Sequence, residues 1–110
     1  MLIAIDFDGT LVNRKGIPTS SNVWLDKPNK GAIETLKLLW EKKIMFYIFT
    51  NRGPEQWHFI KAWLVRNGFE GSQTGDVPYI TNIQQPNTTI YLDDRAVRFT
   101  SWNNFRKLIL

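Results

Sequence analysis

Short apolar runs are spaced along the chain and are separated by longer segments of mixed polarity. The strongest runs are residues 2–6, 44–49 and 89–92, and a weaker one covers residues 78–81. A short continuous apolar run is typical of a strand that is buried on both faces. The pattern therefore predicts three strands of this kind and a weaker fourth.

Between these runs, apolar residues recur at steps of three and four, the spacing of one face of a helix. The first such segment begins near Asn29, a plausible N-cap, and the second has Pro54 in its first turn and stops at Asn67-Gly68. A third begins at Ser101, which we expect to be its cap. The apolar positions expected on the core side of these helices are Ile33, Leu36, Leu39, Trp40, Trp57, Ile60, Trp63, Leu64, Trp102, Phe105 and Leu108.

The predicted order is strand, helix, strand, helix, strand, strand, helix. Alternation of this kind is typical of parallel strands joined by right-handed crossovers. Residues 9–28 are polar and broken by Gly16, Pro18 and Pro28, which predicts a loop or a long hairpin. At 110 residues the chain has the size of one domain. We therefore expect a single α/β domain, residues 1–110, with helices on both faces of a parallel sheet.

Composition narrows the class of protein without identifying a substrate. Cysteine is absent, which excludes disulfides and thiolate metal sites. The N-terminal residues lack the features of a signal peptide, and no apolar run is long enough to span a membrane. The net charge of +4 is mild and suits an anionic substrate without requiring one. We expect a soluble, cytoplasmic protein with no membrane partner, and nothing indicates an oligomer.

Polar residues directly follow each of the three strong strands. The first strand ends in Asp6-Phe7-Asp8-Gly9-Thr10, the middle one is followed by Thr50-Asn51-Arg52, and the last by Asp93-Asp94-Arg95. In a sheet of this class, ligands bind beyond the carboxyl ends of the strands, where the winding direction reverses. Either acidic pair alone could be a turn or a helix cap, but the two pairs together indicate a site.

The residue types at these strand ends point to a divalent cation and a phosphate ester. Four carboxylates at one edge, those of Asp6, Asp8, Asp93 and Asp94, repel one another strongly unless a cation lies among them. Oxygen ligands without His or Cys favour Mg²⁺. One carboxylate can attack phosphorus, and a second can protonate the leaving oxygen and later activate water. Thr50 and the amides of residues 7–10 could donate hydrogen bonds to the phosphoryl oxygens.

Three of these segments resemble the motifs of the haloacid dehalogenase-like (HAD) superfamily. Residues 6–11, Asp-Phe-Asp-Gly-Thr-Leu, look like its first motif, residues 49–52 like its second and residues 92–95 like its fourth, in the same order and spacing. The resemblance covers almost the whole chain. It implies a small Rossmann-like three-layer sandwich in which the first strand is central, between the strands of the second and fourth motifs.

The resemblance also implies a role for each residue. Asp6 is the nucleophile and a metal ligand, and Asp8 is the general acid/base and offers its backbone carbonyl to the metal. Thr50 binds phosphate, and we expect Asn51 and Arg52 beside it to bind substrate as well. Asp93 and Asp94 hold Mg²⁺. A carboxylate at position 8 is what the phosphatases of the superfamily carry, whereas the dehalogenases lack it and the transport ATPases have Thr there.

The resemblance further implies a capless protein. Residues 9–28 are too few for a folded cap domain, and residues 53–80 contain little beyond one helix. An open site of this kind would accept a phosphorylated small molecule or a nucleic-acid end.

The chain departs from the superfamily at the third motif, which is a Lys shortly before the last strand. Gln84 and Gln85 stand in this segment, and neither carries a charge. Loss of one preorganised donor at such a site typically costs about 3 kcal/mol in the activation barrier. Arg52, Arg95 or Lys61 could replace the charge, and Arg52 is the best placed of them. On this hypothesis its guanidinium points at the phosphate.

The residues leave three functions to distinguish. The first is a Mg²⁺-dependent phosphomonoester hydrolase that forms an aspartyl phosphate on Asp6. The second is a catalytically weak relative that binds Mg²⁺ and a phosphorylated ligand, which the absence of the third-motif Lys favours. The third, a phospho-acceptor receiver domain, would need its acceptor Asp after the middle strand, where Thr50 stands. His58, the only histidine, is expected to be structural.

Overall fold

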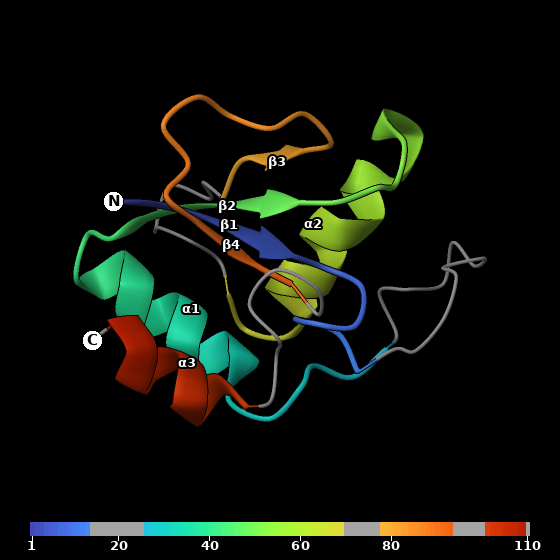
Figure 1. Ribbon diagram of the computed structural model, residues 1–110. Helices are drawn as coiled ribbons and strands as arrows, with labels where there is room; N and C mark the ends of the chain where they lie inside the picture. Colours follow the sequence, from blue (N-terminus) through green and yellow to red (C-terminus); the bar gives the residue numbers. More distant parts are fainter. Residues whose placement is uncertain (14–25, 70–77, 94–100, 110) are drawn as a thin grey trace.

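The computed structural model describes residues 1–13, 26–69, 78–93 and 101–109 (Figure 1). In chain order its elements are β1 (Leu2–Asp6), α1 (Ala32–Glu41), β2 (Met45–Phe49), the 3-10 helix η2 (Pro54–Gln56), α2 (Trp57–Arg66), β3 (Ile80–Thr81), β4 (Ile90–Leu92) and α3 (Trp102–Ile109). This is the order that the apolar pattern predicts. None of the helices in these ranges is long and apolar enough to cross a membrane.

The strands form one parallel sheet, in the order β3-β2-β1-β4 over the described ranges. The register of β1 with β2 runs from Leu2 opposite Met45 to Asp6 opposite Phe49. On its other side, β1 pairs with β4 and ends with Ile5 opposite Leu92. The winding direction therefore reverses at β1, because β2 and β3 follow on one side and β4 joins on the other. The predicted parallel α/β fold is confirmed, with β1 between the two strands expected to flank it.

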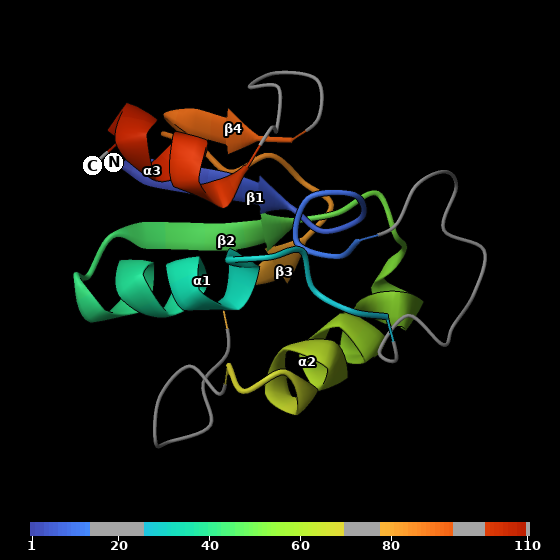
Figure 2. The ribbon, with the colours of Figure 1, turned by 90° about the horizontal axis from the view of Figure 1, so that it is seen from below.

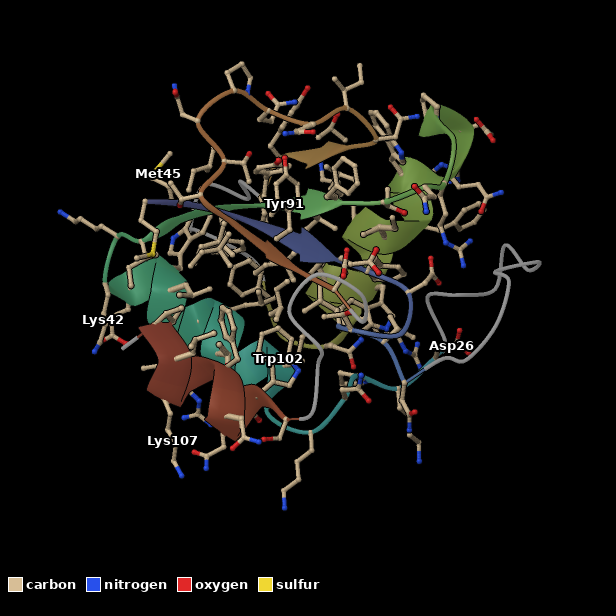
Figure 3. All side chains as sticks on the ribbon, in the orientation of Figure 1. Asp26, Lys42, Met45, Tyr91, Trp102 and Lys107 are labelled. Atoms are coloured by element: carbon tan, nitrogen blue, oxygen red, sulfur yellow. The ribbon has the colours of Figure 1, made fainter. Side chains whose placement is uncertain are left out.

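The hydrophobic core lies on one face of this sheet. Its principal residues are Ile3, Ile5, Phe46, Ile48, Ile80 and Leu92 from the strands, Leu36 and Leu39 from α1, Ile60, Trp63 and Leu64 from α2, and Trp102 and Phe105 from α3. The views in Figures 1 and 2 show α1 and α3 side by side against this face. Trp102 of α3 packs against the start of α1. A Cβ atom added to Gly31, which directly precedes α1, would lie 3.2 Å from the Trp102 Cβ (Figure 3). Within the described ranges, the helices thus cover one face, where the sequence predicts helices on both.

A segment without helix, residues 82–89, crosses the other face of the sheet (Figure 1). It is attached to Tyr47 of β2, whose hydroxyl hydrogen-bonds Thr88 Oγ1 at 2.8 Å and accepts a bond from the Gln85 amide at 3.2 Å. The segment has no apolar repeat at helical spacing, and Asn87 has a φ of 67°. An amphipathic crossover helix cannot form from such a sequence, because it would have no apolar face to bury.

The observed helix ends test the caps and stops that the sequence predicts. Ser101 caps α3 as predicted, since its Oγ accepts a hydrogen bond from the Asn104 amide at 3.1 Å. The end of α2 at Asn67-Gly68 is also confirmed, and Gly68 has the positive φ of 90° that suits glycine. The prediction for α1 was wrong by two residues, because Gly31 and not Asn29 is its N-cap. Asn29 instead uses its side chain in a long-range contact, described below.

Two residues expected in the core are exposed. Leu108 and Trp40, on the last turns of α3 and α1, are 65% and 37% exposed. Trp40 still packs edge-on against Phe46 and Phe69 at the margin of the core. Trp63 and Trp102 are buried as expected, which leaves large rings at the centre of the core.

Candidate active site

The carboxyl ends of β1, β2 and β4 meet at one edge of the sheet (Figure 1). Asp6 ends β1, Thr50 directly follows β2, and Asp93 directly follows β4. Because Ile5 lies opposite Leu92, the next residues, Asp6 and Asp93, leave neighbouring strands about 4.8 Å apart. The register thus brings these two predicted metal ligands together, whereas Asp94 and Arg95 lie outside the described residues.

A tight turn after β1 carries the second carboxylate. The Phe7 carbonyl accepts hydrogen bonds from the amides of Thr10, Leu11 and Val12, at 3.3, 3.0 and 3.1 Å. Gly9 has a φ of 83°, a conformation that a side chain would disfavour, and this lets the chain fold back on itself. The Phe7 ring is fully buried and packs edge-on against Trp63. This anchor holds the turn, and with it Asp8, at the edge of the sheet.

Asn29, which lies outside this turn in the sequence, stabilises it through hydrogen bonds. Its Nδ2 donates to the Thr10 carbonyl at 2.8 Å, with longer contacts to the carbonyls of Gly9 and Val12 at 3.4 and 3.5 Å. Its backbone amide donates to the Leu11 carbonyl at 2.8 Å. Sequence reasoning missed this role, because an Asn shortly before a helix most often signals a cap.

The two ends of the 9–28 segment pair with each other. Val12 and Pro28 form an antiparallel bridge, and the Asn13 amide donates to the Lys27 carbonyl at 2.9 Å. The base of the predicted hairpin is therefore present, while residues 14–25 lie outside the described part of the chain.

The most specific contact at this edge of the sheet joins Arg52 to Asp8. Arg52 Nε donates to Asp8 Oδ2 and Nη2 donates to Oδ1, both at 3.0 Å. This is a bidentate pair, in which two parallel hydrogen bonds fix the plane of the carboxylate. The Arg52 side chain is 2% exposed and that of Asp8 is 16% exposed. The pair is therefore shielded from water. Removing one partner of such a pair strongly lowers the free energy of unfolding, because it leaves the other charge buried.

Neighbouring residues hold Arg52 in this position. Its Nη1 donates to Gln56 Oε1, its amide donates to Thr50 Oγ1 at 3.1 Å, and its carbonyl accepts from Trp57 Nε1 at 2.9 Å. The start of α2 is in this way tied to the loop after β2. Gln56 and Trp57 lie only four and five residues after Arg52, but no motif in the sequence marks either of them as part of a site.

The guanidinium of Arg52, which the charge hypothesis directs at the substrate phosphate, bonds two side chains at this edge of the sheet. Its Nε and Nη2 donate to Asp8, and its Nη1 donates to Gln56. Lys61, the second candidate, lies on the exposed face of α2. Gln85, at the third-motif position, donates its side-chain amide to the Ile83 carbonyl at 2.9 Å, within its own segment.

The other residues predicted for the site differ in their burial and hydrogen bonds. Asp6 Oδ1 accepts a hydrogen bond from the Phe7 amide at 3.0 Å, which restricts the rotation of the carboxylate. The Thr50 hydroxyl is buried and accepts from the Arg52 amide, so its proton can still be donated. Asn51 is exposed. Thr10, in the turn that carries Asp8, has a fully buried hydroxyl with no hydrogen-bond partner among the described residues.

The donor set at this edge fits Mg²⁺ better than a metal that is held by protein side chains alone. In the ranges that the structure describes, no three acidic, His or Cys side chains group closely enough to form a metal cage. Mg²⁺ does not need one, because it is usually held by one or two carboxylates and completed by waters and substrate phosphate. For such an ion, Asp6 and Asp93 would supply two carboxylates and the Asp8 backbone a carbonyl oxygen.

Comparisons of the chain with protein-family models, with curated proteins and with solved structures find no match. The function is therefore inferred from the residues and the geometry of this edge.

Proposed function

We propose that this protein is a Mg²⁺-dependent phosphomonoester hydrolase of the capless HAD-like type, with a Rossmann-like core. The observation that carries the proposal is the convergence of Asp6, Asp93 and the held carboxylate of Asp8 at the carboxyl edge of neighbouring parallel strands. Like charges repel, so two carboxylates at adjoining strand ends favour a cation between them.

In the first half-reaction, a carboxylate oxygen of Asp6 attacks phosphorus and forms a new oxygen–phosphorus bond. The bond from phosphorus to the leaving oxygen breaks, and Asp8 gives its proton to that oxygen. In the second half-reaction, Asp8 takes a proton from water, whose oxygen attacks phosphorus. The bond between Asp6 and phosphorus then breaks, which releases inorganic phosphate and restores both carboxyl groups.

The other residues of the rim orient the phosphoryl group. The Thr50 hydroxyl can donate to one phosphoryl oxygen, and the amides of Asp8 and Gly9 are the donors we assign to another, since the Phe7 and Thr10 amides bond within the turn. Asp6, Asp93, the Asp8 carbonyl and Asp94 are the residues that would hold Mg²⁺. When bound, the ion supplies positive charge that reduces repulsion between Asp6 and the phosphate dianion.

Arg52 is proposed here as a positioning residue for Asp8. The bidentate pair fixes the plane of the Asp8 carboxyl group, and each of its oxygens keeps a second lone pair, one of which can carry the proton that is given to the leaving oxygen. This assignment is an alternative to the hypothesis that Arg52 takes the place of the third-motif Lys, and the bidentate bonds from its side chain to Asp8 favour it.

The test of the proposed function is hydrolysis of a panel of phosphate esters with and without Mg²⁺. The panel comprises nucleoside monophosphates, sugar phosphates, phosphorylated oligonucleotides and p-nitrophenyl phosphate. We expect turnover of at least one class that EDTA removes and Mg²⁺ restores. Mg²⁺-dependent binding of phosphate without turnover would instead identify the catalytically weak relative. The absence of both would refute the proposal.

Arg52→Lys should show whether Arg52 positions the Asp8 carboxylate or binds the substrate phosphate. Lysine keeps the charge but cannot form two parallel bonds to Asp8, so the carboxylate loses its fixed plane. With hydrogen bonds to charged groups worth about 1.5–3 kcal/mol, we expect kcat to fall about 10- to 100-fold for esters with poor leaving groups, and less for good ones.

The matched control for this change is Arg106→Lys, the same substitution on α3. It should leave the rate unchanged. If Arg52→Lys instead raises KM equally for all esters and leaves kcat intact, Arg52 binds substrate phosphate and is not a positioning residue.

A further inference from the structure

The carbonyl groups of the turn after β1 converge on one residue, Asn29. Its side-chain Nδ2 donates to the Thr10 carbonyl at 2.8 Å and lies 3.4 and 3.5 Å from the carbonyl oxygens of Gly9 and Val12. Its backbone amide donates to the Leu11 carbonyl at 2.8 Å. Four consecutive carbonyls of the turn are therefore bonded to a residue that lies 17 to 20 positions further along the chain.

The segment that carries Asn29 is itself attached to the core. Trp63 Nε1 donates to the Asp26 carbonyl at 2.7 Å, and the same indole packs edge-on against the Phe7 ring. Trp63 is fully buried, so it cannot move without disturbing the core. It thus holds both the residue that precedes Asp8 and the segment that leads to Asn29, and the core sets the spacing between them.

Asp8 depends on Asn29 because the residue that follows Asp8 is a glycine. Gly9 has a φ of 83°, and since it lacks a Cβ atom both signs of φ are open to it. The residue before Asp8, Phe7, is anchored by its buried ring. The Gly9 side has no ring to anchor it and is held by the bonds that Asn29 donates. Without these bonds the peptide after Gly9 gains freedom to rotate, and the direction of the Asp8 carboxyl group changes with it.

We propose that Asn29 is a positioning residue for Asp8, the general acid/base. The inference rests on the proposed function and extends the site to a residue that acts through the turn. Asn29 holds the backbone that carries Asp8, while Arg52 holds the plane of its carboxyl group. Proton transfer to the leaving oxygen needs both, because a displacement of about 1 Å can cost about 100-fold in rate.

The first test measures kcat of Asn29→Leu with an alkyl phosphate and with p-nitrophenyl phosphate. Leucine has nearly the shape of asparagine but donates no hydrogen bond. We expect kcat to fall about 10-fold or more for the alkyl phosphate, whose leaving oxygen needs a proton, and less than about 3-fold for p-nitrophenyl phosphate. Asn29→His, whose Nδ1 can donate from the same distance along the side chain, should recover most of the loss. An equal fall for both esters would overturn the inference.

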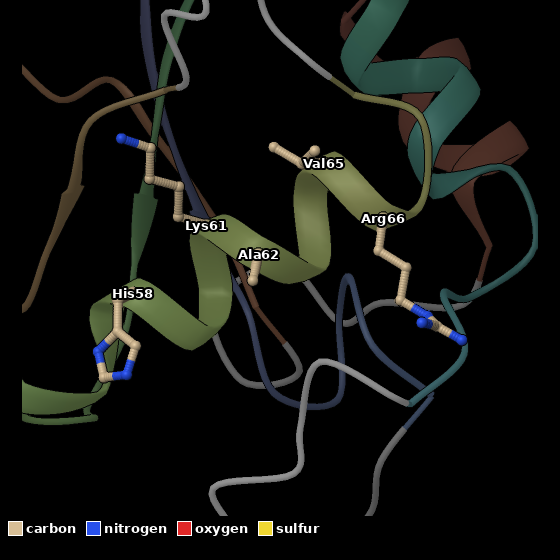
Figure 4. Close-up of a pocket in the computed structure, with 5 residues that line it drawn as sticks. All are labelled: His58, Lys61, Ala62, Val65 and Arg66. Carbon is tan, nitrogen blue, oxygen red and sulfur yellow. The ribbon is translucent and has the colours of Figure 1, made fainter.

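Asn67→Leu is the matched control, because it removes the same kind of bond from another half-buried asparagine. Asn67 directly follows Arg66, the last residue of α2 (Figure 4), and its Nδ2 donates to the Trp63 carbonyl at 2.8 Å. The variant should lower the melting temperature but leave the ratio of the two rates unchanged. A ratio that changes as much in Asn67→Leu as in Asn29→Leu would reveal a general effect of stability and would contradict the inference.

A double-mutant cycle shows whether Asn29 acts through Asp8. In the Asp8→Asn background no acid is left to position, so Asn29→Leu should change kcat for the alkyl phosphate by less than about 2-fold. All variants are assayed at a temperature at which circular dichroism shows them to be folded. A loss as large as in the parent protein would mean that Asn29 acts independently of Asp8, and the inference would fail.

Hydrogen exchange tests the contact without turnover. The amides of Leu11 and Val12 bond the Phe7 carbonyl, and they should exchange about 10-fold faster in Asn29→Leu than in the parent protein. Unchanged exchange would overturn the inference.

The two esters also separate this inference from the proposed function. If the parent protein hydrolyses both and Asn29→Leu leaves the ratio of the two rates unchanged, the inference fails alone. If the parent protein hydrolyses neither, the proposed function fails, and the inference fails with it.

Discussion

Asp6→Asn is expected to abolish turnover, with a loss of about 10⁴-fold or more in kcat, because the amide cannot attack phosphorus. Asp6 ends β1 opposite Phe49, and its carboxylate is oriented by the Phe7 amide. Asn has nearly the same shape, so the strand and the hydrogen bond to Phe7 should survive. The loss should then appear in the chemical step and leave the fold intact.

Binding of inorganic phosphate should be retained or become tighter in Asp6→Asn, because one negative charge beside the anion is removed. Isothermal titration with phosphate in Mg²⁺ measures this, and a steady-state assay measures kcat. Glu41→Gln is the control, since it removes an exposed carboxylate at the far end of α1. Residual activity in Asp6→Asn within tenfold of the parent protein would exclude Asp6 as the nucleophile.

Asp8→Asn should have the second largest effect, a loss of about 10²- to 10⁴-fold in rate for esters with poor leaving groups. Such leaving groups need a proton as the phosphorus–oxygen bond breaks, whereas p-nitrophenolate does not. Single-turnover formation of the aspartyl phosphate should therefore be slowed much less with p-nitrophenyl phosphate than with an alkyl phosphate. Equal slowing of both would argue against Asp8 as the acid.

Asp8→Asn should also lower the free energy of unfolding, because it breaks the ion pair between Asp8 and Arg52. Asn at position 8 removes the negative charge that pairs with the guanidinium of Arg52, whose side chain is 2% exposed. Breaking a buried pair costs about 3 kcal/mol, which for a chain of this size lowers the melting temperature by more than about 10 °C. Thermal unfolding of Asp8→Asn, with Asp6→Asn as the comparison, measures this effect. An unchanged melting temperature would show that the pair does not stabilise the fold.

The sequence alone determined the strands, most helix ends and the acidic residues at the strand ends. Each of these signals is local: an apolar run such as residues 2–6 buries itself as a strand, and Ser101 caps the helix that follows it. Asp6 and Asp93 could be assigned to one edge because the carboxyl ends of parallel strands must meet there.

Only the tertiary structure decided which side chains become partners across long stretches of chain. Asp8 and Arg52 are 44 residues apart, and Asn29 reaches Thr10 across 19 residues, so no periodicity or cap rule links them. The location of the helices on one face was also not predictable from element order, because a crossover can be an extended segment such as residues 82–89 when it has no apolar face to bury. Local sequence thus set the elements and the acidic edge, whereas packing of distant segments decided how Asp8 is held.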